Sequence, residues 1–131
     1  MILESLFGLS LVLNVSLESP LTAPPDQDPA QLSVPQKDAA LLPLMARATD
    51  CIVGKVLSDP RYRPDIRRDQ MNDLIADSFD ACDDAVDALV EAHDRLYGDG
   101  SGEAFLLGPY FDRLPTMVLQ QARTRAGANS R

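Results

Sequence analysis

The longest periodic pattern in the chain lies between residues 69 and 97. Apolar side chains recur there at steps of three and four residues, and acidic side chains hold the opposite face. The pattern predicts one long helix with Asp69 as its N-cap and Gly98 just past its end. Such a helix would be about 42 Å long, more than a small domain usually needs, which leaves a kink open as an alternative.

A second helical pattern precedes this one, and a third follows it. Apolar residues between 41 and 56 share one face, and the tolerance of a first turn for proline puts the predicted helix start near Pro43. After the glycine-rich turn at 98–102, one or two shorter helices are expected, broken at Gly108-Pro109 and Pro115. No strand-like alternation is found, so the predicted fold class is all-α, a three- or four-helix bundle. The helical domain is expected over 38–126, with a disordered tail at 127–131.

The N-terminal segment has a different character. Residues 6–17 form an apolar run that is shorter than the roughly 20 residues needed to span a bilayer, and its length is typical of a secretory signal peptide. The residues before it contain no Lys or Arg, contrary to that pattern. Residues 1–22 are therefore interpreted as a leader-like segment whose true start codon is open, with a core element as the alternative. The Pro-rich stretch 23–37 is expected to be an extended linker.

The charge is acidic and unevenly distributed. Twenty acids against twelve Lys and Arg give a net charge of −8, which argues against nucleic acid or an anionic membrane as a general partner. No Lys or Arg lies between Asp73 and Asp94, a span with eight acids. This face is either a surface for a partner or an ordinary solvated helix face. Its members are Asp73, Asp77, Asp80, Asp84, Asp87 and Glu91.

Four arginines gather in the segment between the first two predicted helices, punctuated by Pro60 and Pro64. They are Arg61, Arg63, Arg67 and Arg68. A cluster of this kind can contact an anion or a partner, or it can pair with the acidic helix that follows. Both interpretations remain open at this stage.

The chemistry-bearing residues do not assemble into a known site. The glycine-rich turn fails the spacing of a calcium loop, because Tyr97 and Gly108 would occupy its two anchor positions. Cys82 and His93 lie three helical turns apart, too far to share a metal along one helix. The sequence therefore predicts no metal site, no cofactor and no catalytic residue.

The two cysteines are better explained as a pair. Cys51 and Cys82 fall on the apolar faces of two neighbouring predicted helices, which must meet when those faces are buried. An inter-helix disulfide is predicted, worth roughly 3 to 4 kcal/mol for a loop of this size, with two free thiols in a cytosolic core as the alternative.

These features predict an exported, soluble, non-catalytic accessory protein that binds another protein. A small acidic helical domain with one disulfide and a leader resembles, in general shape only, several classes of bacterial cell-envelope protein, and no residue role is carried across. The expected location is periplasmic or secreted, with the cytoplasm as the alternative, and no stable membrane span is expected. Two other functions remain open: a small metal- or phosphate-dependent enzyme using the acidic face of the 69–97 helix or the arginine loop, and an acid-responsive chaperone.

Overall fold

A computed structural model of the protein describes residues 28–129. The leader-like segment 1–22 and the first part of the predicted linker lie outside the described residues. The signal-peptide interpretation therefore stays a prediction.

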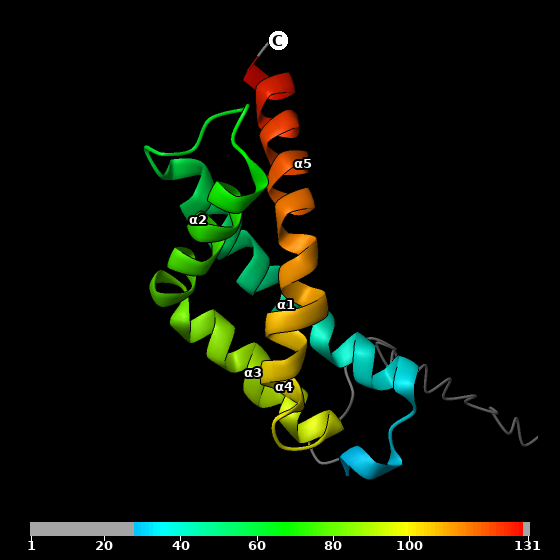
Figure 1. Ribbon diagram of the computed structural model, residues 1–131. Coiled ribbons are helices and arrows are strands. Elements are labelled where there is room, and N and C mark those ends of the chain that lie inside the picture. The colour runs from blue at the N-terminus through cyan, green and yellow to red at the C-terminus, as the bar shows by residue number, and fades with distance from the viewer. Residues whose placement is uncertain (1–27, 130–131) are drawn as a thin grey trace, which may run out of the picture.

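The predicted all-α fold is confirmed, and residues 28–129 contain no strand. Four long helices form the bundle, and they pack at different inclinations (Figure 1). They are α1 (Val34–Ser58), α2 (Arg68–Ala81), α3 (Asp83–Tyr97) and α5 (Phe111–Asn129). A short 3-10 turn, η1 (Pro29–Gln31), precedes α1, and a short helix α4 (Ser101–Phe105) and a π-helical turn η2 (Leu106–Tyr110) lead into α5.

Helix α1 begins at Val34. The predicted start near Pro43 is therefore wrong, and residues 34–37 of the predicted linker are helical. The reason is a capping box: the Gln36 backbone N–H donates to the Ser33 hydroxyl, and the Ser33 backbone N–H donates to the Gln36 side chain. Pro35 fits the first turn, because backbone N–H groups at that position have no acceptor within the helix. Pro43 lies inside the helix, with its ring on the exposed side.

The predicted 69–97 helix is divided in two at Cys82. This residue leaves the helical conformation, with φ −114° and ψ 22°, and α3 resumes at the next residue. The kink that the length of the segment allowed is therefore present. The first helix has Arg67 rather than Asp69 at its N-cap, and Asp69 lies in the first turn instead. The predicted end is confirmed, because α3 stops at Gly98, whose φ of +113° suits glycine.

The C-terminal third is broken once rather than twice. Gly108 carries non-helical backbone angles ahead of Pro109, as the sequence predicts. Pro115 does not break the chain; it lies about one turn into α5 and is buried. Helix α5 then continues to Asn129, so residues 127–129 of the predicted disordered tail are helical. The Ala and Arg residues of this segment are good helix formers. Its last turns reach past the other helices (Figure 1).

The core is mainly aliphatic, with Tyr110 as its largest fully buried side chain, and it lies where α1 packs against α2, α3 and α5. Its largest fully buried side chains include Ile52 of α1, Ile75 of α2, Leu89 of α3 and Leu114 of α5. Burial of each such side chain stabilises the fold by about 1.5–3 kcal/mol relative to exposure. One apolar stripe from each helix therefore builds the core and leaves the polar faces outward.

Candidate functional site

The predicted disulfide is confirmed. Cys51, in the C-terminal half of α1, is bonded to Cys82 at the junction of α2 and α3, with the two Cα atoms 6.0 Å apart. That separation lies within the range of roughly 4.4–6.8 Å that disulfides require. The bond closes a loop with a sequence separation of 31 and ties the bend in the acidic segment to α1. The bend at which the two acidic helices meet is therefore covalently attached to α1.

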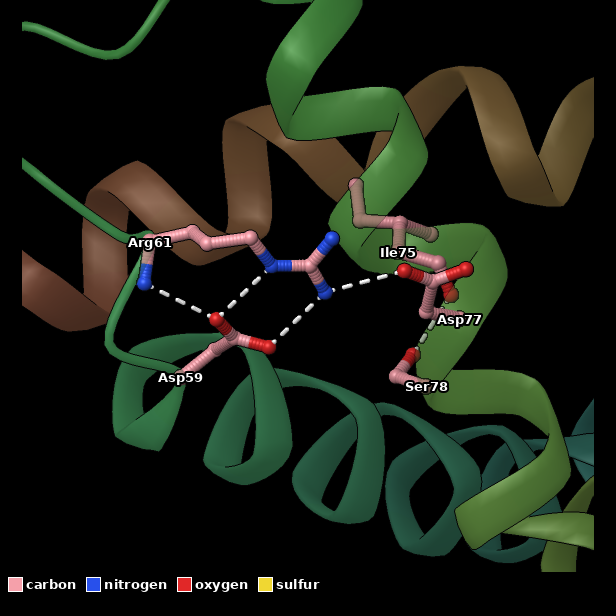
Figure 2. A network of polar contacts seen from close by, with 5 residues as sticks. All are labelled: Asp59, Arg61, Ile75, Asp77 and Ser78. Carbon is pink, nitrogen blue, oxygen red and sulfur yellow. Dashed lines mark hydrogen bonds and ion pairs between the residues drawn. The ribbon is translucent and has the colours of Figure 1, made fainter.

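Arg61 joins the α1–α2 loop to α2 through two carboxylates. Its Nε and Nη2 donate to the two oxygens of Asp59 at 3.1 and 3.0 Å, and Nη2 also donates to Asp77 at 2.9 Å. Figure 2 shows the guanidinium lying between the two acids, with Nη1 outside these contacts. These hydrogen bonds lower the pKa of Asp59 below its ordinary value. Because Arg61 is well exposed, the pairs fix the geometry of the loop more than they stabilise the fold.

The other three arginines of the predicted cluster differ in their ion pairs. Arg67 pairs with Asp69 at 2.7 Å, and Arg63 is only 3.9 Å from Asp65, at the limit of an ion pair. Arg68 has no polar partner among residues 28–129. Each paired arginine has an aspartate two residues away, and that spacing could have indicated the pairing from the sequence. An anion or partner contact by this cluster stays a prediction.

A cleft of about 420 Å³ opens between the α1–α2 loop and α2. Pro60, Ile66 and Leu74 supply its apolar surface. Its polar lining consists of Arg61, Arg63, Gln70 and Asp73. The cleft thus combines part of the arginine cluster with one member of the predicted acidic face, a juxtaposition that the sequence did not predict.

The predicted acidic face is spread over two helices that meet at the Cys82 bend. Asp73, Asp77 and Asp80 lie on α2, and Asp84, Asp87 and Glu91 lie on α3; all are exposed. Among residues 28–129 only Asp77 of these six forms an ion pair, with Arg61. Nowhere in that range are three or more His, Cys, Asp or Glu side chains arranged to hold a metal ion. Whether the face binds a partner remains a prediction.

A stack of aromatic rings that the sequence did not predict lies beside α4, at the end of the molecule far from the α1–α2 loop (Figure 1). It consists of Tyr97 and His93 of α3, Phe105 of α4 and Tyr110 of η2, with neighbouring ring centroids 4.8, 4.8 and 5.8 Å apart. The spacing of His93 and Tyr97 by one helical turn was the available signal. Phe105 and Tyr110 come from beyond the glycine turn, and only the fold brings them into register.

The stack is held at both ends by residues of α1. The Tyr97 hydroxyl donates to Asp38, which raises the pKa of Tyr97 to about 12, and Lys37 lies over the same ring. At the far end the Tyr110 and Thr49 hydroxyls are 2.8 Å apart. His93 Nδ1 lies 2.8 Å from the Ser101 hydroxyl. Burial lowers the pKa of His93, against the opposing influence of Asp94 and Asp38.

Comparison with known proteins supplies no family for this chain: no family model, no curated protein and no solved structure matches it. Within residues 28–129, none of the helices combines the length and apolar character needed to cross a membrane.

Proposed function

We propose that the protein is an exported, non-catalytic accessory protein that binds a basic partner protein through the outward surface of α2 and α3. The observation that carries the proposal is the lack of internal charge compensation there. Asp73, Asp80, Asp84, Asp87 and Glu91 have no ion pair among the described residues, whereas the acids of the α1–α2 loop are matched by arginines. Unpaired surface charge of one sign attracts and orients a partner of the other sign.

The disulfide supports the exported location. Stable disulfides persist in oxidising compartments and are rare in the cytosol. The bond attaches to α1 the α2–α3 bend, at which the two halves of the acidic surface meet. A surface fixed in advance loses less conformational entropy when a partner binds.

The location is tested on the endogenous protein in its native cells. Cell fractionation combined with determination of the mature N-terminus should find the chain outside the cytoplasm, beginning after about residue 19 to 30, as a cleaved leader requires. Thiol titration of the denatured, unreduced protein should find no free thiol. An intact N-terminus and reduced cysteines in the cytoplasm would contradict the exported location.

The binding surface is tested by charge neutralisation with a matched control. The variant D80N/D84N/D87N/E91Q removes four charges from the proposed surface. The control D50N/D99N/E103Q/D112N removes the same number of exposed charges elsewhere. Capture from native cells with the tagged full chain should retain a salt-sensitive basic partner for the wild type and the control only. Equal retention by both variants would refute the role of this surface.

A further inference from the structure

The cleft beside the α1–α2 loop carries two charges of opposite sign without strong partners. Asp73 has no ion pair or side-chain hydrogen bond within residues 28–129. Arg63 has only the 3.9 Å contact with Asp65, and its side chain is 77% exposed. No ion pair joins Arg63 to Asp73 in this part of the chain. Both side chains line the same hollow and remain available to a ligand.

The rest of the cleft is more rigid. Leu74 belongs to the buried core, and Ile66 packs against it, so the apolar surface is fixed. Arg61 is held by Asp59 and Asp77, which leaves Nη1 as a positioned donor. Gln70 adds an amide that can donate and accept hydrogen bonds.

The local charge balance limits which ligands fit. Arg61 and Arg63 are outnumbered by Asp59, Asp65, Asp77 and Asp73, so a simple anion would meet a net negative environment. A simple cation would meet two guanidinium groups in the lining. A ligand with one charge of each sign avoids both penalties, because each of its charges finds an opposite partner.

We infer that this cleft binds a small zwitterion with an apolar body: an α-amino acid, or a short apolar peptide with free termini. The carboxylate faces Arg63 and Nη1 of Arg61, and the ammonium group faces Asp73. The apolar side chain lies on Pro60 and Ile66, above the buried Leu74. A volume of about 420 Å³ lies within the range of roughly 300–1,000 Å³ typical of small-ligand sites. The cleft shares Asp73 with the proposed partner surface. Binding of the zwitterion does not depend on that proposed function, because the other cleft residues lie outside the acidic face.

The test uses the oxidised full-length chain and four probes. Leucine and dileucine carry both charges, N-acetylleucine keeps only the carboxylate, and leucinamide keeps only the ammonium group. Backbone amide shifts of residues 60–74 are followed by NMR during titration. We expect saturable shifts with leucine or dileucine, and affinities about tenfold or more weaker for the singly charged probes, since each loses a charge-assisted hydrogen bond. The tighter of leucine and dileucine identifies the source of the zwitterion.

Variants assign each charge to its partner. R63Q should weaken leucine and N-acetylleucine but leave leucinamide unchanged, whereas D73N should weaken leucine and leucinamide but leave N-acetylleucine unchanged. R68Q and D80N are matched controls, because Arg68 and Asp80 are exposed, unpaired and outside the cleft. None of the four side chains is part of the core, so folding should be preserved.

Three results would overturn the inference. One is the absence of any saturable shift with the zwitterions at millimolar concentration. Another is equal affinity for the zwitterions and the singly charged probes. The last is a loss of affinity in the R68Q and D80N controls equal to that in R63Q and D73N.

Discussion

The disulfide junction and the aromatic stack both fasten α1 to α3, but with different chemistry. At the junction, one covalent bond joins Cys51 to Cys82 at the start of α3. At the stack, Asp38 and Thr49 of α1 hold the ends of a row of rings by hydrogen bonds. The covalent link acts mainly on the unfolded chain and responds to reductants, whereas the stack depends on close packing and on protonation. We therefore expect the connection at the junction to respond to redox conditions and the connection at the stack to respond to pH.

The largest expected effect comes from removing the covalent fastening. C51A/C82A should lower the free energy of unfolding by about 3–4 kcal/mol, because the unfolded chain regains the conformations that the bond excludes. Urea denaturation at neutral pH measures this loss. The wild type with a dithiol reductant should show a similar loss, and an unchanged midpoint in both cases would mean that the bond does not constrain the fold.

The close approach of α4 to α3 beside the stack gives the next effect. A Cβ added at Gly102 would lie 2.3 Å from the Val90 carbonyl oxygen, so G102A must push α4 away from α3. We expect a loss of about 1–3 kcal/mol. The matched control is G54A in α1, where nothing lies within 4 Å of the new atom and a gain of up to about 1 kcal/mol is expected. Equal stability of the two variants would contradict the close packing.

The hydrogen bond at the buried end of the stack is expected to be worth less. Y110F removes the fully buried hydroxyl that lies 2.8 Å from Thr49 and should cost about 1 kcal/mol. In a double-mutant cycle with T49V, the second substitution should cost less in the Y110F background than alone. Strictly additive losses would show that the two hydroxyls do not interact.

The smallest expected effect is a dependence of stability on pH, which the stack should cause and the disulfide should not. Burial lowers the pKa of His93 in the folded protein below its ordinary value of 6.5, so the unfolded chain binds the proton more readily. Stability should therefore fall as the pH drops through 6.5 and below. Denaturant midpoints at pH 7.5 and 5.5 should differ more for the wild type than for H93Q. As a control, the stability contribution of the disulfide, measured with C51A/C82A, should be the same at both pH values. An equal pH response of the wild type and H93Q would rule out His93 as the cause of the pH dependence.

The pairing of helix faces could be predicted from the sequence, whereas local backbone changes could not. The apolar stripes of the first two predicted helices were enough to place Cys51 opposite Cys82, because burial forces those stripes to meet. The sequence allows a kink in this segment but does not place it at Cys82, because the side chain of Cys82 stays on the apolar stripe while its backbone leaves the helical conformation. The prolines of this segment favour an extended chain, whereas the capping pair Ser33 and Gln36 starts α1 at Val34.

The candidate sites show the same division. The exposed arginines and acids were identified from the sequence, but Arg61 lies near Asp77 only because the loop folds back onto α2. The cleft depends on that fold, since it combines loop and helix residues. The stack combines residues from both sides of the glycine-rich turn and is hydrogen-bonded to Asp38 and Thr49 of α1. No spacing along the chain indicates that these residues meet.

The disulfide has a topological consequence for the loop that lines the cleft. Cys51 and Cys82 close a covalent ring, and every cleft residue from Pro60 to Leu74 belongs to it. A protease that cut the exposed loop once between Asp59 and Arg67 would open the ring without releasing a fragment. The two pieces would stay joined as one molecule of nearly unchanged mass, and would separate only after reduction.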